Sequence, residues 1–292
     1  MSDGALAGKI ALITGGGRGM GRAMARAFAR AGATGVTVAS SASPGELAEA
    51  VQEIEEIAGR GTGLAITADV ADPAACAAAV ARTVERFGAL HILVNNAGLG
   101  MKNVGDKRGP FWECRTDGWA RVIATNVDGP FFMARAAAPH LMAAQWGRIL
   151  NVSKSAGSMI QGRNSPYGPS KAALDAMTLI WAQDLAGSGV TANVILPGGL
   201  TATTFSRPSA VPAARKAGRP VYEPDDIAPL AVALASPASD PYNGCRFNAR
   251  GWDGSLPIAE ALEACRELPI FARPRRIGGL ERAWIAPKAP VS

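Results

Sequence analysis

Residues 9–32 read KIALITGGGRGMGRAMARAFARAG, and this stretch decides the fold class. Its first six residues form a short apolar run, typical of a buried β-strand, that ends at a cluster of glycines. Residues 18–32 then place alanine, methionine and phenylalanine at helical spacing, with Gly32 positioned to end the helix. A strand, a glycine-rich turn and a helix in this order predict the first βα unit of a parallel sheet.

The same alternation continues outward along the chain. Further strands are predicted at 36–39, 63–67, 90–94, 148–152 and 190–196, and helices at 46–58, 73–87, about 119–145 and about 165–185. Short apolar strands that alternate with helices favour an α/β fold, with a parallel sheet covered by helices on both faces. We therefore expect a single doubly wound domain over residues 1–292, with its core at about 7–250.

The glycines after the first strand indicate a nucleotide site. Gly15, Gly19 and Gly21 give the pattern Thr-Gly-x-x-x-Gly-x-Gly, and Met20 belongs to the same loop. Glycine permits the tight turn and lets the backbone approach a pyrophosphate, which then rests on the helix N-terminus. Between a strand and a helix, this pattern predicts a dinucleotide cofactor.

The end of the second strand indicates which dinucleotide binds. An Asp or Glu there favours NAD, but this chain has Ser40 and Ser41. Arg18 lies inside the glycine loop and can offer a fork of donors to a 2′-phosphate. We therefore expect NADP(H) to be favoured over NAD(H), and Lys9 or Arg22 could take the role of Arg18.

Asp69 and Val70 follow the third strand. A carboxylate there could accept a hydrogen bond from the adenine amine of the cofactor. Alternatively, Asp69 caps the next helix, and the sequence leaves both interpretations open.

Composition excludes several other classes of protein. The net charge of +6 comes from scattered basic residues, without the interleaved aromatics of single-strand nucleic-acid binders, so no nucleic-acid partner is expected. No apolar run approaches the length that spans a bilayer, and no signal peptide is visible, so we expect a cytoplasmic protein without a membrane partner. The four cysteines lack metal-ligand spacing, and no metal site is predicted.

Tyr167 and Lys171 are the strongest candidates for chemistry. They are four residues apart in the predicted helix at about 165–185, so they share one face. An ammonium close to a phenol favours the phenolate and lowers the pKa of the phenol, which makes a usable acid/base.

Taken together, these motifs resemble the short-chain dehydrogenase/reductase superfamily, in its classical, NADP-preferring type. The markers stand in the family's order from residue 9 to about 200. They are TGxxxGxG at 14–21, Asn-Asn-Ala-Gly at 95–98, Asn126, Tyr167 with Lys171, and Pro197-Gly198. The resemblance implies a Rossmann-type sheet of seven parallel strands, hydride transfer between a nicotinamide cofactor and an alcohol/carbonyl pair, and a homodimer or homotetramer.

The resemblance also implies roles for the catalytic residues. Tyr167 would be the general acid that protonates the carbonyl oxygen, and Lys171 would lower its pKa and bind the nicotinamide ribose. Asn126 would hold a water molecule that links Lys171 to solvent.

Further residues would bind the cofactor by the same resemblance. Asn95, Ala97 and Gly98 would line its ribose. Thr201 and Thr203, just past Pro197 and Gly198, would touch its carboxamide or pyrophosphate.

One position departs from the family pattern. The family places its catalytic serine thirteen residues before the tyrosine, and Lys154 stands there, between Ser153 and Ser155. In one account a local bulge brings Ser155 or Ser153 to the substrate oxygen. In the other, the Lys154 ammonium donates to a developing oxyanion, although it would lie near Lys171. We favour Ser155, because a hydroxyl costs less electrostatically.

The function expected from the sequence is NADPH-dependent reduction of a small-molecule ketone to an alcohol. Residues 201–220 are rich in proline and arginine and suit a mobile flap over the substrate, and 251–292 would form an irregular C-terminal extension. The loop residues that line the substrate pocket in the resembled family are Met101, Trp112, Met159, Gln161 and Phe205. Two other functions stay open, a non-catalytic NADP-binding regulator and an epimerase or dehydratase that uses the same Tyr/Lys pair.

Overall fold

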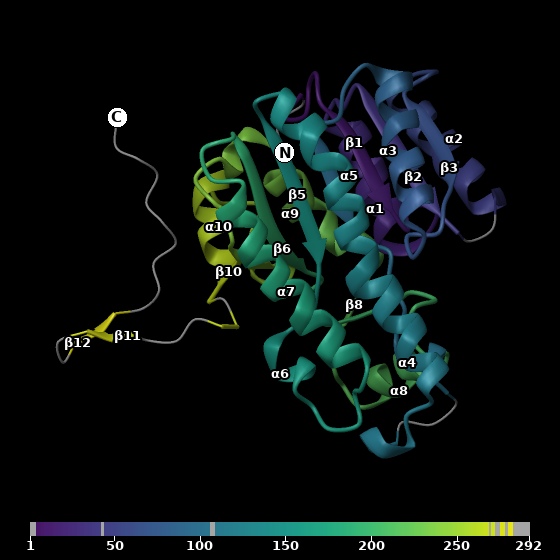
Figure 1. The fold of residues 1–292 in the computed structure, drawn as a ribbon, viewed down its shortest axis with the longest axis vertical. Coiled ribbons are helices and arrows are strands. Elements are labelled where there is room, and N and C mark those ends of the chain that lie inside the picture. Colours follow the sequence, from purple (N-terminus) through teal and green to yellow (C-terminus); the bar gives the residue numbers. More distant parts are fainter. Residues whose placement is uncertain are drawn as a thin grey trace.

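The computed structural model describes residues 4–41, 44–105, 109–268, 270–271, 275–277 and 280–282. The strands of its central sheet are β1 (Ile10–Thr14), β2 (Gly35–Ser40), β3 (Gly63–Thr67), β4 (Ile92–Asn95), β5 (Gly147–Val152), β6 (Val190–Leu196), β9 (Arg246–Asn248) and β10 (Arg266–Glu267). Within the described residues they form one eight-stranded sheet, in the order β10-β9-β6-β5-β4-β1-β2-β3 (Figure 1). All strands of this sheet other than β10 run parallel to one another, and β10 pairs antiparallel with β9. The predicted seven parallel strands are confirmed, with a short antiparallel strand added at one edge.

Helices cover both faces of this sheet (Figure 1). The α-helices are α1 (Gly19–Arg30), α2 (Pro44–Ala58), α3 (Pro73–Phe87), α4 (Thr116–Ile123), α5 (Gly129–Ala143), α6 (Ala156–Met159), α7 (Tyr167–Asp184), α8 (Ala210–Lys216), α9 (Ala228–Ala235) and α10 (Ile258–Cys265). Short 3-10 turns lie at Met101–Asn103, Phe111–Glu113, Pro224–Ile227, Pro237–Ser239 and Ala249–Gly251. None of the helices in the described part of the chain is long and apolar enough to cross a membrane.

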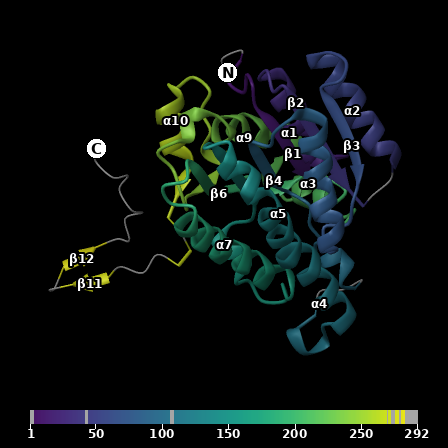
Figure 2. The same cartoon turned by 45° about the horizontal axis from the view of Figure 1, so that its top comes forward.

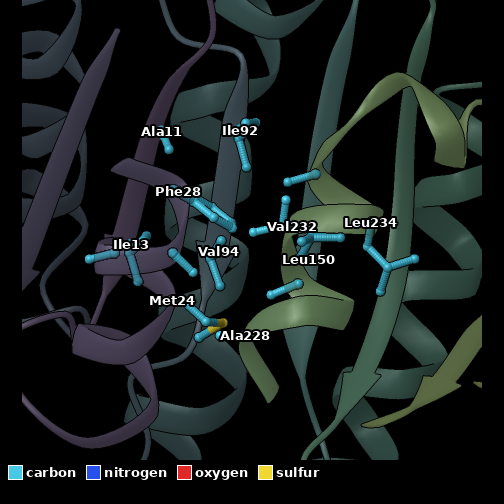
Figure 3. Close-up of a cluster of buried hydrophobic side chains, with 14 of the residues drawn as sticks. Ala11, Ile13, Met24, Phe28, Ile92, Val94, Leu150, Ala228, Val232 and Leu234 are labelled. Carbon is cyan, nitrogen blue, oxygen red and sulfur yellow. The ribbon is translucent and has the colours of Figure 1, made fainter. Parts of the chain in front are cut away.

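Side chains on each strand alternate between two cores. Ala11 and Ile13 of β1 face the core built with α1, α2 and α9, whereas Leu12 faces the core built with α3, α5 and α7. All three are fully buried, as a strand covered on both faces requires. Figure 3 shows part of the first core, with Met24, Phe28, Val232 and Leu234 gathered against the strands.

The helix predicted at 119–145 is interrupted. A π-helical turn, Ala124–Asp128, separates α4 from α5, and the Gly129 amide donates to the Ala124 carbonyl across five residues. The hydrophobic spacing does not show this wide turn, since the apolar residues continue through it. The turn carries Asn126, which is fully buried.

The C-terminal part is more regular than predicted. Strand β9 is only three residues long, too short for a periodic signal, and was not predicted. Within the predicted extension at 251–292, α10 packs into the first core through Leu262 and Cys265. Strands β11 (Arg275–Ile277) and β12 (Leu280–Arg282) form a hairpin that stands away from the body in both views (Figures 1 and 2). The rest of the extension beyond Phe271 lies outside the described residues.

The segment predicted as a flap at 201–220 has secondary structure of its own. It begins at β7 (Leu200–Thr201), which pairs with β8 (Val221–Tyr222). Helix α8 lies between these two strands in the sequence. In Figure 1, α8 lies with α4 and α6 at one end of the molecule. These elements follow the carboxyl ends of the parallel strands, where ligands bind in open α/β sheets.

Candidate active site

The glycine loop after β1 has the backbone geometry that the pattern predicts. Gly15 and Gly19 have φ angles of +64° and +54°, which favour glycine. A Cβ on Gly21 would lie 2.2 Å from the Gly15 carbonyl oxygen, so only glycine fits there. Gly19 and Met20 begin α1, so the loop presents amide groups at a helix N-terminus, where a pyrophosphate fits.

Side chains outside the loop hold it in place. The Thr14 Oγ1 accepts hydrogen bonds from the amides of Asn96 and Ala97, both at 3.0 Å. The Asn96 Nδ2 donates to the Thr14 and Gly15 carbonyls, at 2.8 and 3.2 Å. The loops after β1 and β4 are therefore fastened together. Asn96 of the Asn-Asn-Ala-Gly motif makes this connection, a role that the sequence does not predict.

Arg18 lies at the rim of the loop and is about half exposed. Its Nη1 is 3.4 Å from the Glu46 Oε1, and the Glu46 Oε2 is buried without a hydrogen bond. The neighbouring end of β2 carries Ser40, and Ser41 beyond it is exposed. The cluster therefore contains a cation and two hydroxyls, with Glu46 of α2 as a carboxylate that the sequence did not indicate.

The two alternatives to Arg18 are not available for this role. Lys9 precedes β1, at the opposite end of the sheet, and its Nζ lies 3.8 Å from the ring centre of Trp146. Arg22 makes two hydrogen bonds to Glu53 and one to Glu49. The prediction that either could replace Arg18 is wrong, because both side chains are occupied elsewhere.

Asp69 does not cap α3. Its Oδ1 accepts from the Ala71 amide at 3.0 Å, whereas Asp72 provides the cap by accepting from Ala74. Val70 is buried, and its Cγ2 would lie 2.8 Å from a Cβ on Gly129. The helix-cap interpretation of Asp69 is therefore wrong, and contact with the adenine stays a prediction.

Asn95 ends β4 inside a buried hydrogen-bonded row. Its Nδ2 donates to the Asn151 Oδ1 at 2.9 Å, and the Asn151 Nδ2 donates to Thr178 of α7 at 2.8 Å. Asn95 therefore ties β4 to β5 and α7. Asn151 and Thr178 were not predicted, since isolated polar residues in apolar elements carry no motif.

Gly98 brings Asn126 and Lys171 to one place. A Cβ on Gly98 would lie 3.3 Å from the Asn126 Oδ1 and 3.9 Å from the Lys171 Nζ. The Asn126 side chain exchanges hydrogen bonds with the Leu99 backbone and donates to the Ser170 Oγ at 3.0 Å. The π-helical turn, the loop after β4 and α7 are thus joined at a single buried amide.

Tyr167 and Lys171 stand on the first turns of α7, as predicted. Lys171 is buried and donates to the Val152 carbonyl at 2.8 Å, and burial and then the charge of Lys154 lower its pKa to about 8. Burial raises the pKa of the Tyr167 phenol, opposite to the predicted direction. The reason is that removal of the ring from water disfavours the phenolate.

The residues at 153–155 point in different directions. Ser153 is buried and donates to the Asp175 Oδ1 at 2.5 Å. Ser155 is exposed, and its Oγ lies 2.8 Å from the Ser158 Oγ. The Lys154 Nζ lies 4.7 Å from the ring centre of Tyr167. The Lys154 ammonium therefore lies over the ring of the candidate acid, whereas the two hydroxyls are bonded to Asp175 and Ser158.

The segment after β6 closes one side of the site. A Cβ on Gly19 would lie 3.3 Å from the Thr203 Cγ2, so Thr203 stands beside the phosphate loop, while Thr201 is buried. The Phe205 ring lies 5.5 Å from the Tyr167 ring. Pro197 and Gly198 make the turn before it, and Gly198 has a φ of +93°.

The remaining pocket candidates divide into two groups. Met101 and Met159 are buried, and Met101 belongs to a small cluster against which Tyr167 packs. Trp112 and Gln161 are exposed, with 73% of Trp112 accessible. Met101 therefore lies against the candidate acid, whereas Trp112 and Gln161 lie at the surface.

Comparisons with known proteins agree with this geometry. Residues 9–211 match the family model described as short chain dehydrogenase. A short-chain type dehydrogenase/reductase of Picea abies is 35% identical over 79% of this chain and 87% of its own. A 2,5-dichloro-2,5-cyclohexadiene-1,4-diol dehydrogenase of Sphingobium indicum is 37% identical over 79% and 90% of the two chains. Versicolorin reductase 1 of Aspergillus parasiticus is 36% identical over 70% and 75%.

A solved structure gives the same result. The crystal structure of a short-chain type dehydrogenase/reductase from Mycobacterium marinum superimposes with a TM-score of 0.74 at 30% sequence identity. The superposition covers 83% of this chain and 94% of the other. The shared fold therefore includes nearly the whole of that protein.

Proposed function

Because the chain belongs to the short-chain dehydrogenase/reductase family, and is therefore an oxidoreductase of the alcohol/carbonyl pair, we propose that it reduces a ketone with NADPH. The observation that carries this proposal is the Tyr167 phenol, held on α7 beside a buried Lys171. The cradle formed by Gly15, Gly19 and Gly21 fits a dinucleotide, since a Cβ on Gly21 would overlap the Gly15 carbonyl. The reaction is reversible hydride transfer.

In this mechanism Tyr167 acts as the general acid. A bound nicotinamide cofactor supplies the hydride, and the Tyr167 Oη gives its proton to the carbonyl oxygen. Burial raises the pKa of this phenol, so it keeps its proton until charge develops on the substrate. The arrangement therefore suits reduction.

Lys171 and Asn126 form the path by which Tyr167 regains its proton. Lys171 has a lowered pKa of about 8, so it can lose and regain a proton near neutral pH. Asn126 is fixed close to it across Gly98. A water molecule between Asn126 and Lys171 would complete the relay to solvent.

We propose a preference for NADPH on the basis of the Arg18 cluster. The 3.4 Å contact between Arg18 and Glu46 is long for an ion pair, so a 2′-phosphate can compete for the guanidinium. Ser40 and Ser41 add hydroxyl donors. Asp69 and Val70 would meet the adenine, and Asn95, Ala97, Thr201 and Thr203 would meet the rest of the cofactor.

The preference can be measured directly by cofactor binding. Arg18→Ala should weaken NADPH binding by at least tenfold while changing NADH binding little, because a charge-assisted hydrogen bond is worth about 1.5–3 kcal/mol. Arg30→Ala, at the other end of α1, is the matched control. Tighter NADH than NADPH binding by the unchanged protein would overturn the preference.

The substrate that we propose is an apolar ring ketone or ring alcohol. Met101 and the Phe205 ring lie against Tyr167 and give it an apolar surrounding, and the buried Met159 ends the short helix α6 that precedes α7. The names of two relatives, a cyclohexadiene-diol dehydrogenase and versicolorin reductase, support this class. In this proposal the segment 201–220 is the flap that covers the substrate.

The experiment that tests the function is NADPH oxidation with a set of ketones, including 9,10-phenanthrenequinone, cyclohexanone and ethyl acetoacetate. Turnover of the cyclic ketones above that of ethyl acetoacetate is the expected result. NADPH binding without turnover of any carbonyl would favour the non-catalytic regulator, and epimerised or dehydrated product would favour the other enzyme classes. A cytoplasmic homodimer or homotetramer stays a prediction from the sequence.

A further inference from the structure

We propose that Lys154, and not a serine, is the hydrogen-bond donor that stabilises the substrate oxygen during hydride transfer. This inference rests on the proposed ketone reduction. It deepens that function by naming the second residue that touches the reacting oxygen.

The first argument is the position of the side chain. Lys154 stands two residues beyond the end of β5, and its Nζ lies 4.7 Å from the ring centre of Tyr167. A lysine has a flexible stem and three rotatable donors, so rotation about its torsions brings an N–H to an oxygen that also accepts from the Tyr167 phenol.

The second argument is that the neighbouring hydroxyls are used elsewhere. Ser153 donates to Asp175, which is itself buried and forms an ion pair with the buried Arg246. Ser155 pairs with Ser158 at the surface. Among the described residues, neither hydroxyl makes a hydrogen bond to Tyr167.

The third argument is that the backbone resists the bulge that would bring Ser155 inward. The Ser153 amide donates to the Ile195 carbonyl of β6 at 3.0 Å. Arg246 donates through Nη2 to the Lys154 carbonyl at 3.1 Å. Rotating this stretch would break both hydrogen bonds and leave a buried guanidinium with fewer partners, at a cost of about 1–3 kcal/mol for each buried group.

The repulsion between the ammonium groups of Lys154 and Lys171 does not rule out a lysine at this position. Among the described residues, the titratable groups that face the Lys154 side chain include Tyr167 and Lys171 on α7, and the Arg246 guanidinium of β9 donates to the Lys154 backbone carbonyl. Lys154 lowers the pKa of Lys171, so the strain between the two ammonium groups is relieved when Lys171 releases its proton. The negative charge that develops on the substrate oxygen is attracted by the Lys154 ammonium, which keeps its proton.

The reaction balances without a further component. Hydride adds to the carbonyl carbon, the π electrons move to oxygen, and the Tyr167 Oη transfers its proton to that oxygen. Lys154 donates a hydrogen bond and keeps its proton throughout. The products are the alcohol, the oxidised cofactor and a tyrosinate that the relay reprotonates.

The kinetic test compares three variants with 9,10-phenanthrenequinone and NADPH. Lys154→Met, of similar length, should lower kcat about 100-fold with little change in KM, because the donor acts mainly in the transition state. Lys154→Ser restores a hydroxyl and should keep kcat within about tenfold. Ser155→Ala should stay within about twofold. A full loss in Ser155→Ala with normal kcat in Lys154→Met would overturn the proposal.

A second test needs neither turnover nor cofactor. Binding of 4-nitrophenol, followed by its absorbance, distinguishes the phenolate from the neutral phenol. The unchanged protein should bind the phenolate at least about tenfold more tightly than Lys154→Met does. Equal binding, or none to either protein, would overturn the proposal. A protein that reduces no ketone yet shows this difference would contradict only the proposed function.

Discussion

The two halves of the site are held together by different kinds of interaction. In the cofactor half, defined as residues 14–21 and 95–98, glycine backbone geometry and the Thr14 and Asn96 hydrogen bonds fix every position. The catalytic half is defined as residues 152–155 and 167–171. Buried charged side chains hold it in place, namely Lys171 and the adjoining Asp175–Arg246 ion pair. A position that depends on glycine backbone geometry tolerates almost no substitution. A position that depends on a side-chain hydrogen-bond donor can use another residue type, as proposed for Lys154.

The largest effect is expected from Tyr167→Phe in the catalytic half. Loss of the acid should lower kcat by about 10³-fold, within the range for general acid catalysis. NADPH binding, measured by fluorescence, should stay within about threefold, because the cofactor half is untouched. A similar loss of binding would show that the two halves are not separable.

Gly21→Ala is the corresponding change in the cofactor half. The new Cβ would overlap the Gly15 carbonyl and approach the Asn96 side chain, so NADPH binding should fall by at least about tenfold. The free energy of unfolding should decrease by about 1–3 kcal/mol, as for other overpacked sites. Denaturant unfolding and cofactor titration measure the two effects. Gly157→Ala is the control, since a Cβ there would meet nothing within 4 Å.

The pH dependence of stability reports on the buried charge in the catalytic half. Because the pKa of Lys171 is lowered to about 8, the unfolded chain binds more protons than the native chain from about pH 8 to its ordinary value of 10.5. Stability relative to Lys171→Met should therefore be least below pH 8 and rise through this window. In Lys154→Met the rise should begin at a higher pH, because one of the two causes is removed. An identical window in both proteins would contradict the effect of the Lys154 charge on Lys171.

The smallest expected effects are the changes in stability caused by Ser153→Ala and Ser155→Ala. Ser153→Ala leaves the buried Asp175 without one donor and should destabilise the fold by about 1–3 kcal/mol. Ser155→Ala removes an exposed hydroxyl and should change stability by less than about 0.5 kcal/mol. Thermal or denaturant unfolding measures both. Equal effects would mean that Asp175 gains nothing from the hydroxyl of Ser153.

The sequence was most informative where backbone requirements decide the structure. The strands at 63–67 and 190–196 and the helix at 73–87 have the predicted limits, because period, proline and glycine mark them. Gly15, Gly19 and Gly21 likewise stand where the pattern requires. A motif that depends on main-chain geometry leaves a visible trace in the sequence.

Contacts between distant side chains left no such trace. The pairing of Asp175 with Arg246 joins α7 to β9, and no local pattern connects those two positions. The direction of the Tyr167 pKa was predicted wrongly, because the lysine four residues away is visible in the sequence while burial of the ring is not. The role of Lys154 depended on the same long-range packing.

The π-helical turn at Ala124–Asp128 has a consequence for the phase of the helices around it. A wide turn holds one residue more than an α-helical turn, so the faces of α4 and α5 are offset by about 100° from a continuous helix. This offset lets Met133 and Leu141 face the sheet while Val122 packs beside Met101 at the substrate end. Deleting one residue from the turn would make a regular helix and turn one of these faces to solvent. The turn therefore sets which side chains of α5 face the sheet and which side chains of α4 face the substrate end.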